Sequence, residues 1–214
     1  MADIAIIGGH GKVALRLARL LTGRGDSVTS WVRNPDHVAE VQATGARALL
    51  ADLEAMNLDE MTGHLAGHSA VVWAAGAGGG DPQRTYAVDR DAAARSMDAA
   101  DAAGVRRFIM VSYFYDRPNH GVPQGSGFYA YAEAKVAADD QLRASDLDYV
   151  ILGPSRLTDN PGTGRIETGE TLTKSSVSRD DVAAVVAHIL ATPSVSRVTI
   201  DFNTGDTPIA DAIP

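Results

Sequence analysis

Short apolar segments alternate with longer amphipathic segments along most of the chain. The short segments are rich in β-branched or aromatic residues and are bounded by Gly, Asp or Pro, which is typical of buried strands. We expect strands at residues 3–7, 27–32, 46–50, 70–75, 107–112 and 148–153. The longer segments repeat apolar residues at helical spacing or are rich in alanine, and we expect helices at residues 12–23, 88–104, 131–145 and 179–190.

This alternation of strand and helix predicts a mostly parallel sheet with helices on both faces. Right-handed crossovers then give a doubly wound α/β sheet, the Rossmann fold. A chain of 214 residues suits one large domain, residues 1–214. After Gly153 turn-forming residues dominate a small C-terminal region. We expect residues 113–127 and 153–175 to be the loops that wall a substrate pocket, with ordinary surface loops as the alternative.

A glycine-rich turn, GGHGKVA, joins the first predicted strand to the first predicted helix. Gly9, Gly11 and Ala14 satisfy G-x-G-x-x-A, and Gly8 with Gly11 and Ala14 satisfies G-x-x-G-x-x-A. We prefer the second register because it starts directly after the strand. Such small residues permit a tight turn that brings a pyrophosphate to the helix N-terminus, and a plain tight turn is the alternative. The predicted dinucleotide site contains Gly8, Gly9, His10, Gly11, Lys12 and Val13.

The end of the second strand bears on the choice of cofactor. A site for NAD usually carries Asp or Glu there, whereas this chain reads WVRNPDH, with Arg33 and no acid before Asp36. A guanidinium can bind a 2′-phosphate through paired hydrogen bonds. We therefore predict NADP(H) in preference to NAD(H), with a solvated loop arginine as the alternative.

The next two strand ends extend the predicted cofactor site. Asp52 and Leu53 follow the third strand, where a side chain can reach adenine. Ala74, Ala75 and Gly76 follow the fourth strand, and their small side chains leave room for ribose and phosphate. Together these residues predict one cofactor lying across the carboxyl edge of the sheet.

A Tyr–Lys pair and a strand-end serine are candidates for catalysis. Tyr131 and Lys135 lie four residues apart in YAEAK, and Ser112 closes the fifth strand. The lysine cation would favour tyrosinate and hold the nicotinamide ribose, while the tyrosine exchanges a proton with a substrate oxygen that the serine orients. A packing pair is the alternative. Neighbouring tyrosines that compete for the role are Tyr113, Tyr115 and Tyr129.

The sequence resembles the atypical short-chain dehydrogenase/reductases, the NAD(P)-binding, NmrA-like and sugar-epimerase-like Rossmann proteins. The resemblance spans nearly the whole chain and rests on GGHGKVA, WVRNP, ADLE, VVWAAGAG, AGVRRFIMVS, YAEAKVAADDQLRASDLDYVILGPSRLTD and NTGDTPIADAI. It implies a Rossmann fold, with NADP bound by Gly8–Lys12, Arg33, Asp52 and Ala74–Gly76. It also implies that the nicotinamide is bordered by Ser112, Tyr131 and Lys135.

The resemblance leaves three functions open. The first is an NADP(H)-dependent oxidoreductase that reduces a small carbonyl, quinone, flavin or similar acceptor. The second is an epimerase or dehydratase of nucleotide sugars, and the third is a non-catalytic NADP(H) sensor. Where the family often reads DYTIVRPG, this chain reads DYVILGPS, with Val150, Gly153 and Ser155 at the altered positions. The change alters the pocket beside the nicotinamide.

Composition narrows the remaining options. The net charge of −8 argues against general binding of nucleic acid or anionic membranes, and the lack of cysteine excludes thiol nucleophiles and disulfides. His64 and His68 offer no third ligand, so we expect no metal site. The first residues do not resemble a signal peptide and no apolar run approaches a membrane span, so we expect a cytoplasmic protein. A small-molecule substrate is the expected partner, and the apolar faces of residues 87–103 and 128–145 could pair in a homodimer.

Two polar pairs favour structural interpretations. Ser178, three residues before Asp181, is typical of a helix N-cap. Asp139 and Asp140 fall within the helix predicted at 131–145, and we expect both to lie on its solvated face.

Overall fold

The central sheet has nine strands in the order β11-β8-β10-β6-β5-β4-β1-β2-β3. The computed structural model describes residues 1–115, 119–169 and 171–214. All strands from β3 to β10 in this order run parallel, and β8 and β11 add antiparallel pairs at one edge. The strands are β1 Asp3–Ile7, β2 Ser27–Val32, β3 Arg47–Leu50, β4 Ala70–Trp73, β5 Arg107–Val111, β6 Asp148–Pro154, β8 Arg165–Thr168, β10 Val198–Thr204 and β11 Thr207–Pro208. A separate two-stranded sheet pairs β7 Arg156–Thr158 with β9 Ser176–Ser178.

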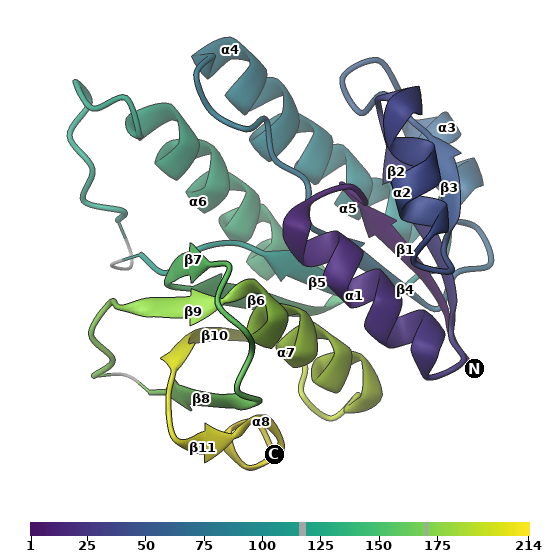
Figure 1. Cartoon of the computed structure of the whole chain (residues 1–214). Coiled ribbons are helices and arrows are strands. Elements are labelled where there is room, and N and C mark those ends of the chain that lie inside the picture. The colour runs from purple at the N-terminus through teal and green to yellow at the C-terminus, as the bar shows by residue number, and fades with distance from the viewer. Residues whose placement is uncertain (116–118, 170) are drawn as a thin grey trace.

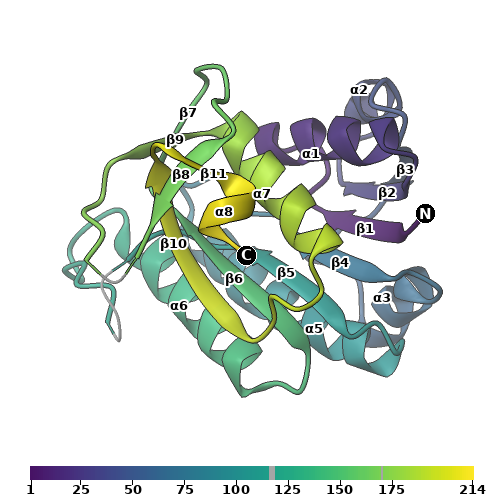
Figure 2. The ribbon, with the colours of Figure 1, turned by 90° about the horizontal axis from the view of Figure 1, so that it is seen from below.

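Helices cover both faces of the central sheet (Figures 1 and 2). One core cluster packs α1, α2, α7 and α8 against one face, and a second packs α3, α5 and α6 against the other. The helices are α1 Lys12–Gly23, α2 Val38–Gln42, α3 Leu58–Leu65, α4 Pro82–Thr85, α5 Ala93–Ala102, α6 Tyr129–Ala144, α7 Arg179–Ala191 and α8 Ile209–Ala212, with a 3₁₀ turn at Pro35–His37 and a π-helical segment at Tyr86–Ala92.

Strand β1 lies inside the sheet and is buried on both faces. Successive side chains of a strand point to opposite faces. Ile4 and Ile6 therefore join the core beneath α1 and α7, while Ala5 and Ile7 join the core on the α3 and α5 side. Since both faces are covered, the strand is apolar throughout rather than alternating.

The predicted doubly wound α/β fold is confirmed, with all six expected strands in place. The expectation for the C-terminal region was incomplete. Residues 153–175, predicted as loops, contain β7 and β8, and β10 was not predicted at all. In β10, the buried Phe202 and Asn203 follow partly exposed residues, so its hydrophobic pattern is weak. Residues 116–118 and 170, which fall in the two predicted loops, lie outside the described residues.

The helix predicted at 88–104 begins earlier than expected. The helical path starts at Pro82 and continues through the π-helical segment into α5. Asp81 caps it, because its side chain accepts hydrogen bonds from the backbone N–H groups of Gln83 and Arg84. Proline is well suited to the first helical position, since its missing N–H would have no partner there. The Asp-Pro start signal at residues 81–82 was available in the sequence.

The predicted N-cap of α7 is confirmed. Ser178 Oγ accepts a hydrogen bond of 2.9 Å from the Asp181 N–H. The Asp181 carboxylate is buried and accepts hydrogen bonds from the N–H groups of Thr163 and Gly164. Within residues 1–115, 119–169 and 171–214, no helix combines the length and apolar character that a membrane crossing requires.

Candidate functional site

A cavity of about 290 Å³ opens at the carboxyl ends of β1, β2 and β4 and beside the turn after β3. In an open parallel sheet this edge is where ligands bind. Its lining comprises Gly8, His10, Gly11, Trp31, Val32, Arg33, Asn34, His37, Ala51, Asp52, Leu53, Glu54, Ala74, Ala75, Gly76, Arg84 and Val88. The predicted residues that meet there are Gly8, His10, Gly11, Arg33, Asp52, Leu53, Ala74, Ala75 and Gly76.

The glycine turn is held tightly between β2 and β4. Gly8 has φ +88°, and a Cβ there would lie 2.4 Å from Ala75 Cα. A Cβ at Gly9 would lie 2.5 Å from Ser30 Cβ, so glycines of both sequence registers are sterically required. Gly11 is the N-cap of α1, and the first turn of that helix carries no acidic residue. The N-terminal N–H groups of α1 are therefore suited to an anion such as a pyrophosphate.

Four predicted cofactor residues do not line the cavity. Gly9 packs against Ser30, and Val13 belongs to the core under α1. Lys12 forms an ion pair of 2.7 Å with Asp159. Lys135 is buried beneath the end of β5. Gly9 therefore lets the turn lie close to β2, and Val13 packs into the core that supports α1. Lys12 and Lys135 form polar contacts outside the cavity.

Two arginines meet one carboxylate at the rim of the cavity. Arg33 Nη1 lies 3.0 Å from Glu54 Oε1, and Arg84 Nε lies 2.9 Å from the same oxygen. Arg84 also donates a hydrogen bond of 2.7 Å to the Ala77 carbonyl, which fixes its guanidinium. Of these three residues, Arg33 was predicted from the sequence, whereas Arg84 and Glu54 were not. The helix start at Asp81 would have placed Arg84 in a first helical turn at this edge of the sheet.

His10 and Asp52 make local contacts within the cavity wall. The His10 ring stacks on His37 with 3.4 Å between ring centroids, and His10 Nε2 lies 2.7 Å from Glu40 Oε2. The Asp52 side chain accepts a hydrogen bond of 3.1 Å from the Glu54 N–H and so stabilises the turn after β3. His37 and Glu40 come from the segment after β2, which the sequence analysis did not assign to the site.

A buried charged cluster lies beneath the end of β5. Lys135 is 1% exposed, and its ammonium donates a hydrogen bond of 3.0 Å to the Val111 carbonyl. Asp139, one turn further along α6, is fully buried and accepts a hydrogen bond of 2.7 Å from Ser112 Oγ. Burial lowers the pKa of Lys135 and raises the pKa of Asp139. The positive charge of Lys135 and the negative charge of Asp139 compensate each other, which lowers the cost of burying both.

The expectation of a solvated Asp139 was wrong, while Asp140 is exposed and pairs with Arg143 as a surface residue does. Tyr131, Lys135 and Asp139 are spaced four residues apart and therefore share one face of α6. That face meets the end of β5, where Ser112 and the Val111 carbonyl supply partners. The spacing was visible in the sequence, but the polar partners come from a different element.

Tyr131 lies in an aromatic group at the start of α6. Its ring centroid is 5.0 Å from that of Phe128 and 5.5 Å from that of Tyr113. Burial raises the pKa of Tyr131 well above its usual value, and the nearby Asp89 carboxylate raises it further. The Lys135 ammonium donates its hydrogen bond to the Val111 carbonyl, and stabilisation of tyrosinate by Lys135 stays a prediction. At neutral pH Tyr131 is a protonated phenol, which is the form that donates a proton.

Asp89 lies between the cavity and the buried cluster and was missed by the sequence analysis. It belongs to the π-helical segment Tyr86–Ala92 and is buried. One oxygen accepts a hydrogen bond of 2.9 Å from the Ala77 N–H, while Oδ1 faces Gly76 and has no hydrogen-bond partner among the described residues. Burial raises its pKa, and the positive charge of Lys135 opposes that shift.

The family assignment follows from comparison with known proteins. Residues 8–193 match the family model described as NAD(P)H-binding. The chain belongs to this family. The match covers the glycine turn, the cavity and the buried cluster in one continuous stretch. The predicted resemblance to NAD(P)-binding Rossmann proteins is confirmed, and it is consistent with the atypical short-chain dehydrogenase/reductases.

Relatives of this NAD(P)H-binding protein span its full length. The uncharacterised sugar epimerase YhfK of Bacillus subtilis is 36% identical, with 98% of each chain covered. The UPF0659 protein YMR090W of Saccharomyces cerevisiae is 32% identical, with 96% of this chain and 95% of its own covered. The structure of a Bacillus halodurans protein that is named as an NAD-dependent epimerase/dehydratase superposes with a TM-score of 0.91 at 31% identity. The superposition covers 100% of this chain and 99% of that one. The structure of the oxidoreductase ylbE of Lactococcus lactis superposes with a TM-score of 0.87 at 29% identity, and the superposition covers 99% of this chain and 94% of that one.

Proposed function

We propose that this protein is an NADP(H)-dependent oxidoreductase that reduces a small carbonyl, quinone, flavin or similar acceptor. One observation carries the proposal: a single cavity runs from the glycine turn to two arginines that share one carboxylate. A nicotinamide dinucleotide fits these residues, because the turn has no room for side chains and the N-terminus of α1 has no acid to repel a phosphate. The oxidoreductase name of ylbE supports the same reaction class.

The adenosine end of the cavity supports the choice of NADP(H). Glu54 lies within hydrogen-bond distance of both Arg33 and Arg84. A 2′-phosphate carries more charge than a carboxylate and matches the paired donors of a guanidinium. We propose that the 2′-phosphate replaces Glu54 as the partner of the two arginines. Asp52 and Leu53 would border the adenine, and Ala74, Ala75 and Gly76 the ribose and phosphates.

The reaction end supports proton transfer to the acceptor. The bound nicotinamide supplies the hydride. Tyr131, held as a protonated phenol, would donate the proton to the acceptor oxygen. The Ser112 hydroxyl donates a hydrogen bond to Asp139 Oδ2. Burial raises the pKa of Asp139 and so favours its protonated form. In that form Asp139 would donate the hydrogen bond to Ser112 Oγ and leave the Ser112 hydroxyl free to orient the acceptor.

The test is NADPH oxidation by the purified protein against a panel of quinones, flavins, aldehydes and ketones. The proposal predicts turnover with at least one acceptor class and a slower rate with NADH. No turnover with any acceptor, despite tight NADPH binding, would contradict it. In that case a redox-dependent difference in cofactor affinity would indicate a sensor.

A sugar epimerase or dehydratase is the second candidate. The observation that favours it is the 36% identity to YhfK, which is named as a sugar epimerase. Such an enzyme regenerates its cofactor within each cycle. Cofactor that stays bound through purification, together with conversion of a nucleotide sugar without net NADPH oxidation, would support this reading over the oxidoreductase.

A further inference from the structure

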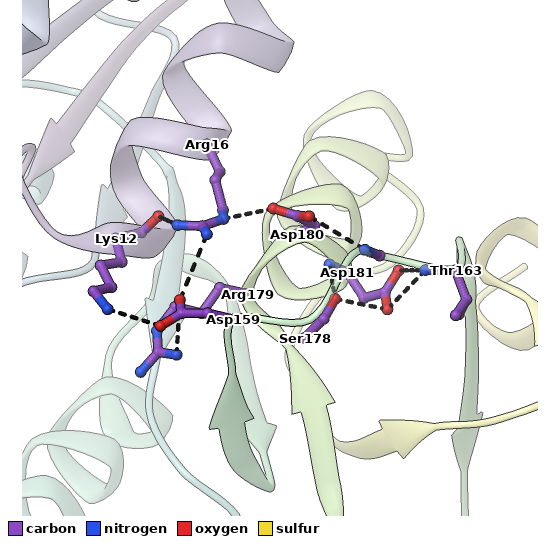
Figure 3. A network of polar contacts seen from close by, with 9 residues as sticks. Lys12, Arg16, Asp159, Thr163, Ser178, Arg179, Asp180 and Asp181 are labelled. Atoms are coloured by element: carbon purple, nitrogen blue, oxygen red, sulfur yellow. Dashed lines mark hydrogen bonds and ion pairs between the residues drawn. The ribbon is translucent and has the colours of Figure 1, made fainter.

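Three cationic side chains gather around the carboxylate of Asp159, where the N-termini of α1 and α7 approach each other (Figure 3). Lys12 Nζ lies 2.7 Å from Asp159 Oδ2. On the other oxygen, Arg179 Nη1 lies at 3.1 Å and Arg16 Nη2 at 3.5 Å. These cations come from two helices far apart in the sequence, so only the fold brings them together.

Nearby carboxylates do not neutralise this cluster completely. Asp180 accepts a hydrogen bond from Arg16 Nε, which leaves three cations facing two carboxylates. Asp181 is adjacent in sequence, but its oxygens accept hydrogen bonds from Ser178 and from backbone N–H groups. The local excess of positive charge stands out in a chain whose net charge is −8. An anion is the ligand that such a cluster attracts.

The cluster lies at the same sheet edge as the proposed reaction site. Lys12 directly follows Gly11, which lines the cofactor cavity. Asp159 directly follows β7, and β7 follows the end of β6. There the Ser112 N–H bonds the Leu152 carbonyl and the Phe114 N–H bonds the Pro154 carbonyl. The cations therefore lie at the carboxyl edge of the sheet, where α1 and α7 begin.

One of the three cations, Arg16, is held in place, while the carboxylate between them is easy to displace. Arg16 Nη1 donates a hydrogen bond of 2.8 Å to the Lys12 carbonyl, which fixes its guanidinium. The Lys12 and Asp159 side chains, in contrast, are 64% and 48% exposed. Solvent screens such a pair, and exposed ion pairs contribute little to stability. A carboxylate or phosphate of a ligand could therefore replace Asp159 at small cost.

We propose that Lys12, Arg16 and Arg179 bind an anionic group of the substrate, a carboxylate or a phosphate, and that Asp159 occupies this site in the free protein. The proposal deepens the proposed function, on which it rests, by making the acceptor an acidic molecule. Selection of an anionic acceptor would then be made by Lys12, Arg16 and Arg179, which do not line the nucleotide cavity.

The test measures binding of inorganic phosphate and of succinate by calorimetry, with the protein saturated with NADPH. Asp159→Asn removes the resident charge, and we expect both anions to bind about two- to fivefold more tightly than to the wild type. Arg179→Met removes a cation but keeps an apolar stem, and we expect binding of both anions to be lost. The matched control is Arg106→Met, since Arg106 pairs with Asp101 at 3.0 Å on an exposed surface elsewhere; it should leave anion binding unchanged.

Three outcomes would overturn the substrate site. One is equal anion affinity in the wild type and Asp159→Asn, and another is unchanged affinity in Arg179→Met. The third is anion binding that disappears when NADPH is added, because the probe then occupied the cofactor phosphate site. Anion binding is measured without turnover, so failure of this site and failure of the oxidoreductase proposal are seen in separate experiments.

Discussion

The two ends of the candidate site place their charges in opposite surroundings. At the proposed adenosine end, Arg33 and Arg84 share Glu54 at the rim of an open cavity. At the reaction end, Lys135 and Asp139 are buried beneath β5. Charges at the open rim are screened by water and can exchange partners, whereas buried charges depend on one another. The proposed adenosine end is therefore suited to admit a ligand, whereas the buried charges of the proposed reaction end depend on one another.

This contrast predicts that substitutions at the reaction end have the larger effects. Tyr131→Phe removes the proposed proton donor while keeping the ring that packs on Phe128 and Tyr113. Once an acceptor is known, we expect kcat to fall by about 10²–10⁴-fold, the usual contribution of a general acid. NADPH affinity should not change. Steady-state kinetics with calorimetric binding would check both. An unchanged kcat would remove Tyr131 from the mechanism.

Lys135→Met tests how far the buried cluster depends on its buried lysine. The substitution removes the positive charge that most favours the ionised forms of Asp89 and Asp139, and leaves only the charges of Arg84 near Asp89 and Arg143 near Asp139. We expect the free energy of unfolding to fall by about 3–5 kcal/mol, measured by urea denaturation. Lys12→Met is the control, because Lys12 pairs on the surface, and it should cost at most about 1 kcal/mol. If both variants lost the same free energy of unfolding, the buried lysine would contribute no more to stability than the exposed one.

Gly9→Ala tests the steric basis of the glycine turn. A Cβ at Gly9 would lie 2.5 Å from Ser30 Cβ, so the turn must shift. We expect a loss of about 1–3 kcal/mol in stability, as for other overpacked sites, together with weaker NADPH binding. The matched control is Gly23→Ala at the end of α1, where a Cβ meets nothing within 4 Å. A wild-type affinity in Gly9→Ala would contradict the close packing of this turn.

Asp139→Asn changes the pH dependence of stability. Because burial raises the pKa of Asp139 above 3.8, the folded state binds its proton more tightly than the unfolded state. This contribution is fully present below about pH 3.8 and is lost as the pH rises through the folded-state pKa. The variant should therefore gain stability relative to the wild type with rising pH, at most about 1.4 kcal/mol per pH unit. Parallel stability curves for the two proteins would argue against a raised pKa.

The same two regions explain how much could be predicted from the sequence. The lining of the cavity was largely predictable. Gly8, Gly11, Arg33, Asp52 and the small residues after β4 each follow a strand that the hydrophobic pattern identifies. Parallel strands bring their carboxyl ends to one edge, so order along the chain translates into proximity. Arg84 was not predicted, because the helix was expected to begin at residue 88 and in fact begins at Pro82.

The reaction end was less predictable, since burial of charge depends on partners from other elements. Asp139 has the local pattern of a surface residue. Its burial depends on Ser112 and Tyr115 from the end of β5, in addition to the cations of Lys135 and Arg143 on its own helix. Asp89 is similar, because its environment is set by Gly76 and Ala77 after β4. Strand β10 was missed for a related reason. Its partly exposed residues gain their strand structure from pairing with β6 rather than from a clear hydrophobic pattern.

The central claim is that the open rim of the cavity is a site for the 2′-phosphate of NADP(H). Calorimetric titration of NADPH and NADH into the wild type, Arg33→Ala and Arg84→Ala tests it most directly. We predict that the wild type prefers NADPH, and that each substitution weakens NADPH binding by about 10- to 100-fold, the worth of a charged hydrogen bond, without changing NADH binding. Equal affinity of the wild type for NADPH and NADH, or equal losses for both cofactors in the variants, would contradict the account.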